Sequence, residues 1–120
     1  MGRTYSFECE KCGYLAQVAG AFAEGTALAV QTIVCYECRT LTDAVVACRV
    51  PVAEPDPPGP PELDALMKRL PSLEVTRWVR FNAACPVDPK HDIEEWKDPG
   101  KCPRCGVFIE RGAFPFRQWD

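Results

Sequence analysis

The sequence lacks features that would point to several common classes of protein. No apolar run approaches the ~18 residues that a membrane-spanning helix needs, so we expect no integral membrane protein. Residues 1–7 lack the apolar core of a secretory signal, which favours a cytoplasmic protein. With 14 Lys and Arg against 17 Asp and Glu, the net charge of −3 gives no basic surface for nucleic acid. These absences argue against membrane proteins, secreted proteins and nucleic-acid binders.

Histidine is nearly absent as well, and His91 is the only one in the chain. One histidine leaves little scope for Ser-His or Cys-His catalysis. The sequence also has no glycine-rich phosphate loop and no nucleophile elbow. The acidic residues that follow His91, at Asp92, Glu94 and Glu95, most simply form a solvated face. We therefore expect no catalytic site.

Cysteine, in contrast, is abundant, with eight residues in a chain of 120. Six of them form three C-x-x-C pairs: Cys9/Cys12, Cys35/Cys38 and Cys102/Cys105. A two-residue gap lets one tight turn aim both thiolates at the same metal ion. Gly13 and Gly106 directly follow two of the pairs, where a positive φ often closes such a turn. Disulfides would need an oxidising compartment, so the pattern favours metal binding.

The spacing predicts two sets of four ligands. Cys9, Cys12, Cys35 and Cys38 have the spacing C-x2-C-x22-C-x2-C, which is typical of a four-thiolate zinc site. Cys85, His91, Cys102 and Cys105 form the second set, spaced C-x5-H-x10-C-x2-C. Both sets would be closed and structural, so we expect two zinc ions, with iron as the alternative because it accepts the same thiolates. Whether His91 is a ligand or a surface residue stays open.

The hydrophobic pattern predicts a mainly β protein. Strands are expected over residues 5–8, 14–18, 27–34, 74–82 and 107–110. From Thr42 to Val50 the apolar residues alternate, which would place Ala44, Val46, Cys48 and Val50 on one strand face. Cys48 is then more simply a buried hydrophobic residue than a ligand, although a ligand role stays open.

The middle of the chain is rich in proline and divides it into three parts. Six of the twelve prolines lie in residues 51–61, which we interpret as a stiff, extended linker. Residues 62–70 place Leu63, Leu66, Met67 and Leu70 at helical spacing, so they predict a short amphipathic helix. A helical turn is also expected at residues 93–96. The predicted fold is a small, metal-stapled, mainly β protein with one or two short helices.

The segments FECEKCGY (7–14) and KCPRCG (101–106) resemble the knuckles of zinc ribbons. The resemblance implies an N-terminal zinc ribbon over 1–50, a Pro-rich linker over 51–61, and a C-terminal unit over 62–120 with a helix and a second knuckle. The resemblance indicates metal binding and does not assign a function. From the sequence as a whole we expect a non-catalytic zinc-binding protein that acts as a protein-interaction or adaptor module, with a nucleic-acid-contacting zinc ribbon as a weaker alternative. Trp96, Arg117 and Trp119 are the expected contact residues.

The same two knuckles also resemble those of rubredoxins, which hold one iron between them and carry an electron. This resemblance implies a different set of ligands, in which Cys9, Cys12, Cys102 and Cys105 share iron. Cys35 and Cys38 would then form a second site with Cys85 and His91. A rubredoxin-like electron carrier is therefore the alternative function.

Overall fold

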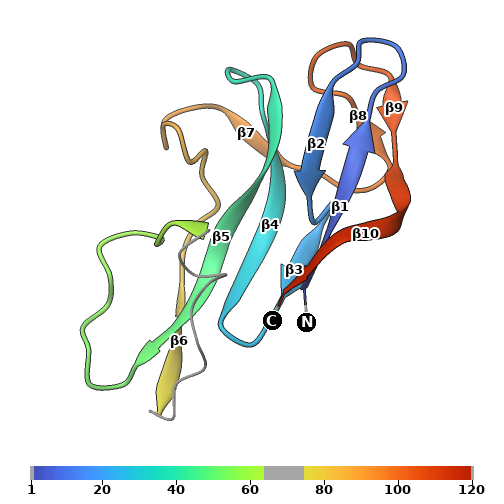
Figure 1. Cartoon of the computed structure of the whole chain (residues 1–120). Helices are drawn as coiled ribbons and strands as arrows, with labels where there is room; N and C mark the ends of the chain where they lie inside the picture. The colour runs from blue at the N-terminus through green and yellow to red at the C-terminus, as the bar shows by residue number, and fades with distance from the viewer. Residues whose placement is uncertain (1, 64–74, 120) are drawn as a thin grey trace.

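The computed structural model of the chain describes residues 2–63 and 75–119. These residues form ten strands in three antiparallel sheets (Figure 1). The strands are β1 (Gly2–Glu8), β2 (Leu15–Val18), β3 (Phe22–Glu24), β4 (Leu28–Cys35), β5 (Thr40–Pro51), β6 (Thr76–Arg80), β7 (Ile93–Glu95), β8 (Gly100–Lys101), β9 (Phe108–Ile109) and β10 (Arg111–Trp119). The mainly β class predicted from the sequence is confirmed.

The first and last strands of the chain lie in the same sheet. Its order is β10-β1-β2, and it brings the two termini side by side (Figure 1). Trp119 lies opposite Gly2, and its indole ring fills the space that a Cβ on residue 2 would need. The turn from β1 to β2 carries Cys9 and Cys12. Arg111, at the start of β10, lies opposite Phe7, so the segment that precedes β10 comes close to the first cysteine pair.

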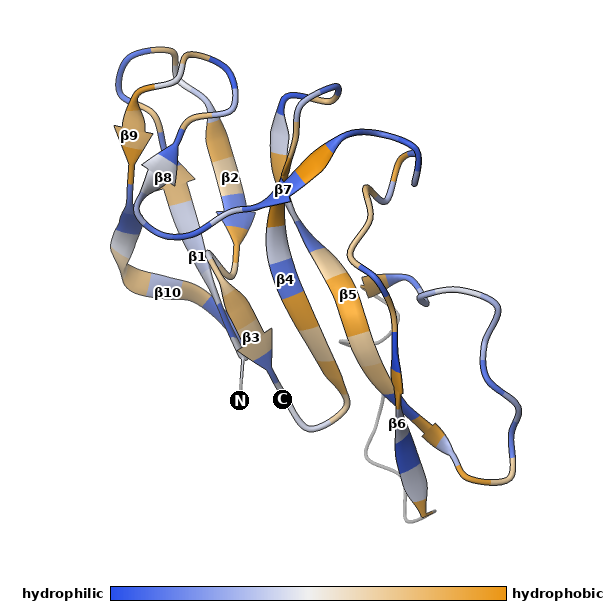
Figure 2. Ribbon diagram, turned by 180° about the vertical axis from the view of Figure 1, so that it is seen from behind, coloured by the Kyte–Doolittle hydropathy of each residue, from blue (hydrophilic) through white to orange (hydrophobic). Residues whose placement is uncertain are grey.

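The second sheet is built around β4, whose eight residues are all buried. One edge of β4 pairs with β5 along its whole length, and the other edge pairs first with β3 and then with β7. β6 adds to the far side of β5. In Figure 2 the most hydrophobic part of β5 is its middle, which lies beside β4. Burial on both faces fits the composition of β4, in which only Gln31 and Thr32 are polar.

A β-bulge in β5 interrupts the alternation of buried residues that the sequence predicts. Ala47 lies opposite Ala29, but Val45 lies opposite the next residue, Val30, so Val46 is an extra residue. Because the bulge adds one residue, side chains after it lie on the opposite face from the one that simple alternation with the residues before it predicts. Cys48 and Val50 therefore share the buried side with Val45, while Val46 is only half-buried. Cys48 is fully buried in the core, as the sequence predicts.

The helical predictions have different outcomes. Residues 93–95 form strand β7 instead of a helical turn, because β4 offers an unpaired edge there and Ile33, Val34 and Cys35 pair with them. The helix expected over 62–70 lies, from residue 64 onward, outside the described residues. No helix in the described ranges is long and apolar enough to cross a membrane.

The Pro-rich segment 51–61 contacts the strand that follows it in the chain. The Arg77 guanidinium forms an ion pair with Asp56 and donates a hydrogen bond to the carbonyl oxygen of Glu54. Val52 N–H donates to the carbonyl oxygen of Val75 at 3.0 Å. The strands before and after this segment, β5 and β6, pair with each other. The division into units at 51–61 stays a prediction.

Two clusters of buried side chains form the core. The first surrounds Phe7, which is fully buried and meets Trp96 edge-on with ring centroids 5.1 Å apart. The second contains Leu28, Cys48 and Trp119. The first core lies beside the cysteine pairs of residues 9–12 and 102–105, because Cys9 and Cys102 are themselves among its buried members. Packing in this core therefore holds the two pairs in place.

A buried carboxylate joins β5 to the loop between β2 and β3. Both oxygens of Asp43 accept a hydrogen bond from Ala19 N–H, at 3.1 and 3.0 Å, and one also accepts from the Thr32 hydroxyl at 2.6 Å. The Thr32 oxygen in turn accepts from Gly20 N–H at 2.8 Å. Burial raises the pKa of the Asp43 carboxyl above its ordinary value, and these hydrogen bonds offset only part of the rise. The network satisfies polar groups that water cannot reach.

Replacing Asp43 by alanine is expected to lower the free energy of unfolding by about 2–3 kcal/mol, because it leaves the Ala19 and Thr32 donors buried without an acceptor. Urea unfolding of the metal-loaded protein measures the loss. Asp43→Asn is the matched control: it retains an acceptor oxygen, so it should lose clearly less. Equal stability of the alanine variant and the unsubstituted protein would contradict this role for Asp43.

Candidate metal centres

The eight residues predicted as metal ligands gather into two groups of four. Within each group, the sulfur and nitrogen atoms that can bind a metal all lie within 4.8 Å of one another. The first group, here called the four-cysteine cluster, contains Cys9, Cys12, Cys102 and Cys105. The second, here called the histidine cluster, contains Cys35, Cys38, Cys85 and His91. Each group supplies four ligands, which is the number that a structural zinc ion takes.

The pairing of the C-x-x-C motifs differs from the one that the spacing predicts. Cys9 and Cys12 meet Cys102 and Cys105, not Cys35 and Cys38, so the first predicted set is wrong, and with it the second. The reason is the sheet of β1, β2 and β10. Pairing of β10 with β1 brings Arg111 opposite Phe7 and so places the segment before β10 near Cys9, while β4 carries Cys35 into the other sheet. The set implied by the rubredoxin resemblance is the one that the fold brings together.

The two turns of the four-cysteine cluster have the same backbone structure. In the first, Gly13 N–H donates to the Cys9 carbonyl at 2.8 Å, and Cys9 N–H donates to the Tyr14 carbonyl at 2.8 Å. In the second, Gly106 N–H donates to the Cys102 carbonyl at 3.0 Å, and Cys102 N–H donates to the Val107 carbonyl at 2.7 Å. Gly13 and Gly106 have φ values of 78° and 82°, which confirms the positive φ predicted for both glycines.

The turn at Cys35 is a third copy without a glycine. Arg39 N–H donates to the Cys35 carbonyl at 2.8 Å, and Arg39 has a φ of 54°. Cys38 N–H also donates to the Cys35 sulfur at 3.3 Å. A non-glycine residue in this left-handed conformation is strained. No sequence signal predicts this conformation, because a C-x-x-C motif followed by arginine does not resemble the other two turns.

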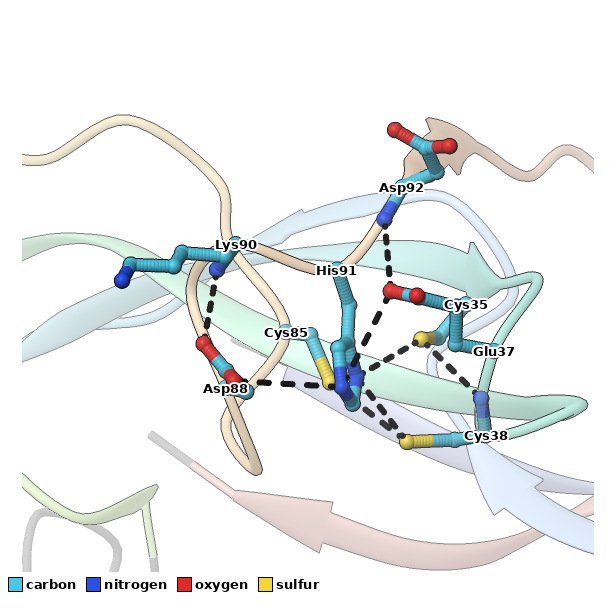
Figure 3. A network of polar contacts seen from close by, with 8 residues as sticks. All are labelled: Cys35, Glu37, Cys38, Cys85, Asp88, Lys90, His91 and Asp92. Carbon is cyan, nitrogen blue, oxygen red and sulfur yellow. Dashed lines mark hydrogen bonds and ion pairs between the residues drawn. The ribbon is translucent and has the colours of Figure 1, made fainter.

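His91 enters the histidine cluster through one ring nitrogen. Its Nδ1 atom lies 3.6 Å from the Cys35 sulfur and 3.4 Å from the Cys38 sulfur. Figure 3 shows the ring between these sulfurs and two carboxylates. On the carboxylate side, Nε2 lies 3.8 Å from Glu37 Oε2 and 4.0 Å from Asp88 Oδ2. Nδ1 is therefore the atom positioned to bind a metal, with Nε2–H left for a carboxylate partner.

The loop that carries His91 is fastened directly to the Cys35–Cys38 turn. Tyr36 N–H donates to the Asp92 carbonyl at 3.1 Å, and Asp92 N–H donates to Glu37 Oε2 at 3.3 Å. Within the loop, Asp88 accepts from Lys90 N–H at 2.9 Å (Figure 3). Glu37 thus contacts both the His91 loop and the His91 ring, although nothing in the sequence pattern marks it as a functional residue.

The distances within the clusters suit a tetrahedral metal. The sulfur atoms lie 3.3 Å apart in the pair Cys9–Cys105, 3.6 Å apart in Cys12–Cys102 and 3.7 Å apart in Cys38–Cys85. Around zinc with Zn–S bonds of about 2.3 Å, tetrahedral sulfurs lie about 3.8 Å apart. A disulfide bond would need about 2.05 Å, and none of the eight cysteines, all of which lie in the described residues, forms one. The geometry therefore fits metal ligands and not disulfides.

The thiol pKa values show why a cation fits these clusters. Hydrogen bonding from Cys12 N–H lowers the pKa of Cys9 to about 7. Burial and the neighbouring sulfur of Cys35 raise the pKa of Cys38 to about 12. In the four-cysteine cluster, Val107 N–H lowers the pKa of Cys105, but burial and the thiols around it raise it to about 12. Sulfurs this close cannot all ionise without a positive charge between them, and a bound metal ion supplies that charge.

Two of the three contact residues expected from the sequence are buried. Trp96 and Trp119 are only 4% and 7% exposed, so they cannot serve as contact residues. Trp96 packs on Phe7 and donates from its indole nitrogen to the Lys101 carbonyl at 3.1 Å. Trp119 belongs to the second core cluster. Of the three expected contact residues, only Arg117 is exposed.

Compared with models of protein families, with curated proteins and with solved structures, the chain shows no match. The functional argument therefore rests on the chemistry and geometry of the two clusters.

Glu37→Gln is expected to weaken metal binding at the histidine cluster by about tenfold, because carboxylate partners that orient a ligating histidine typically contribute 10–100-fold to affinity. Competition with a chromophoric chelator measures the affinity. Glu10→Gln is the matched control, since Glu10 is an exposed residue of the Cys9–Cys12 turn. If both variants bind the metal as tightly as the unsubstituted protein, Glu37 does not orient His91.

Proposed function

We propose that the chain is a non-catalytic zinc-binding protein, in which two structural zinc ions hold together a small β fold that serves as a protein-interaction or adaptor module. The observation that carries the proposal is the gathering of eight ligand residues, far apart in sequence, into two groups of four. Four protein ligands fill the coordination of zinc and leave no open position for a substrate or an activated water. Such centres stabilise a fold and do not catalyse.

The choice of zinc is supported most directly by the histidine cluster. Three thiolates and one imidazole nitrogen form a standard donor set for structural zinc. Eight cysteines without a disulfide among them fit a reducing compartment, which supports the cytoplasm as the location. Counting charge, the four-cysteine cluster with zinc adds −2 and the histidine cluster with zinc adds −1. With the formal −3 of the chain, the loaded protein would carry about −6, which disfavours nucleic acid as the partner.

The adaptor role is supported by what the metal-binding loops expose. Tyr36 lies between Cys35 and Cys38, Val87 lies between Cys85 and His91, and Phe108 follows the Cys102–Cys105 turn closely. These three large apolar side chains are 53%, 77% and 70% exposed. Metal binding would fix the loops that carry them, so each centre would present an apolar side chain to a protein partner at little cost in conformational entropy.

A second candidate function has an observation in its favour. The four-cysteine cluster contains the cysteines that the rubredoxin resemblance assigns to one iron, and its two turns are backbone copies of each other. A one-iron electron carrier would therefore use this cluster, with the histidine cluster as a structural zinc site. Iron and zinc both accept four thiolates, so the donor set alone favours neither metal at this cluster.

Elemental analysis of protein purified without added metal, together with its visible spectrum, tests both functions. Two zinc ions per chain and a colourless protein are the expected result. One iron and one zinc per chain, with a red colour that a reductant bleaches, would replace the adaptor role by electron transfer. Protein that holds fewer than one metal ion per chain, and does not bind added zinc, would overturn both.

A further inference from the structure

The three C-x-x-C turns lie at the same end of the molecule, although they belong to two different clusters (Figure 1). The Cys35–Cys38 turn joins β4 to β5, and the other two turns join β1 to β2 and β8 to β9. Contacts between these turns are therefore contacts between the two candidate metal centres.

Two arginines link the centres in a reciprocal arrangement, here called the arginine clasp. Arg39, the residue after Cys38, donates from Nη2 to the carbonyl oxygen of Arg104 at 2.7 Å. Arg104, which lies between Cys102 and Cys105, donates from Nε back to the carbonyl oxygen of Arg39 at 3.4 Å. Each guanidinium thus binds the backbone of a turn that belongs to the other centre.

Tyr14 connects the remaining turn to the same place. The Arg104 guanidinium lies over the Tyr14 ring, 4.8 Å from its centroid, and Tyr14 is two residues after Cys12. The Tyr14 hydroxyl accepts a buried hydrogen bond from Leu41 N–H at 2.8 Å, and Leu41 is three residues after Cys38. Both turns of the four-cysteine cluster therefore contact the segment that leaves the Cys35–Cys38 turn.

The backbone at Arg39 indicates that its side chain has a role of its own. The equivalent position in the other two turns is glycine, with φ values of 78° and 82°. Arg39 occupies this left-handed region at a φ of 54°, where an L side chain costs free energy and glycine does not. The local turn alone favours glycine, whereas the contact with Arg104 requires a long donor side chain.

We propose that the arginine clasp couples the two metal centres, so that metal at one centre raises the affinity of the other. The inference rests on the proposed metal-binding function. A metal ion at the four-cysteine cluster fixes the Cys102–Cys105 turn and with it the Arg104 carbonyl and guanidinium. Those groups hold Arg39 and thereby the Cys35–Cys38 turn in its ligating conformation. Since coupling is reciprocal, metal at the histidine cluster has the same effect on the four-cysteine cluster.

A cycle of four full-length proteins tests the coupling: the unsubstituted chain, Cys12→Ser, Arg39→Gly, and the double variant Cys12→Ser/Arg39→Gly. Cys12 is exposed, so its replacement empties the four-cysteine cluster with the least disturbance of the core. Zinc affinity at the histidine cluster is measured for each protein by competition with a chelator. Arg111→Ala is the control for the loss of an arginine side chain, because Arg111 contacts the Tyr5 ring and Asp98 but takes no part in the clasp.

Emptying the four-cysteine cluster is expected to weaken zinc binding at the histidine cluster about tenfold in the Arg39 background, within the usual range of allosteric coupling. In the Arg39→Gly background the same change should have an effect of less than about threefold, because the short bond to the Arg104 carbonyl is lost and only the 3.4 Å bond from Arg104 Nε to the residue-39 carbonyl and the Tyr14–Leu41 bond remain among these contacts. Arg39→Gly itself should not lower the melting temperature, since glycine relieves the backbone at this position. If Arg39 had only a structural role, Arg39→Gly would change the melting temperature. Emptying the four-cysteine cluster would then still weaken zinc binding at the histidine cluster about tenfold in the Arg39→Gly background.

Zinc release from the loaded proteins gives a second test that needs no empty centre. With excess chelator, the unsubstituted protein and Arg111→Ala should lose both ions in one phase, and Arg39→Gly should lose them in two. Single-phase release from Arg39→Gly, or an unchanged affinity ratio, overturns the clasp while leaving the proposed function intact. A chain that binds no zinc at either cluster overturns the proposed function itself.

Discussion

Removal of both metal ions is expected to unfold the protein. Structural zinc sites of this donor type bind with apparent free energies of about 10–16 kcal/mol at pH 7, which matches or exceeds the total stability of about 5–15 kcal/mol of an ordinary domain. The two clusters tie both ends of the chain and the end of β4 to distant segments, through Cys9 with Cys102 and Cys35 with Cys85. Without metal, ionised sulfurs this close in the four-cysteine cluster repel one another, and this repulsion destabilises the fold.

Circular dichroism and thermal melting, before and after treatment with a chelator under reducing conditions, measure this effect. The cooperative melting transition should disappear on chelation and return when zinc is added. Magnesium is the control, because it prefers oxygen ligands and should restore nothing. A chelated protein that melts at the temperature of the loaded one would show that the metal ions do not stabilise the fold.

Phe7→Ala is expected to lower the free energy of unfolding by about 3–5 kcal/mol, which is the usual loss for a fully buried phenylalanine. Its ring meets Trp96 edge-on and also fills the space beside Gly20, so its loss opens a cavity between two sheets. Because the same core contains Cys9 and Cys102, the variant should also release metal to a chelator more readily.

Denaturant unfolding of the metal-loaded protein measures the loss of stability, and Phe114→Ala serves as the control. Phe114 is a phenylalanine of β10 with 84% of its surface exposed, so its replacement should change stability by less than about 0.5 kcal/mol. Similar losses in the two variants would contradict the assignment of Phe7 to the core that supports the four-cysteine cluster.

The metal-binding turns could be predicted from the sequence because their signal is local. A C-x-x-C motif followed by glycine specifies a turn, and Gly13 and Gly106 have the expected positive φ. The burial of Cys48 could equally be predicted, since it follows from alternation along one strand. Both predictions depend on residues within one element, where steric and hydrophobic preferences act directly.

The partners of each turn could not be predicted in this way. Cys9 and Cys12 lie nearer in sequence to Cys35 than to Cys102, so spacing favoured the nearer pair. The pairing is decided instead by β10 lying against β1, a contact between the two ends of the chain. The Val46 bulge and the β7 strand have the same origin, because each depends on the neighbouring strand and not on its own residues.

The burial of Trp96 and Trp119 shows a further limit of sequence analysis. A tryptophan beside arginines suits a binding surface and a small core equally well, and composition does not separate the two. Here Gly100 and Gly2 leave space for the two indole rings, since a Cβ at either position would collide with them. That relation is visible only once the strands are paired.

Zinc content of paired cysteine variants tests most directly the claim that the four-cysteine cluster and the histidine cluster are the two metal centres. Cys12→Ser/Cys102→Ser removes two ligands of one cluster and is expected to retain one zinc per chain. Cys12→Ser/Cys38→Ser removes one ligand from each cluster and is expected to retain none. The reverse result, with one zinc retained by the Cys12/Cys38 variant and none by the Cys12/Cys102 variant, would show that Cys9, Cys12, Cys35 and Cys38 share a metal and would contradict the account.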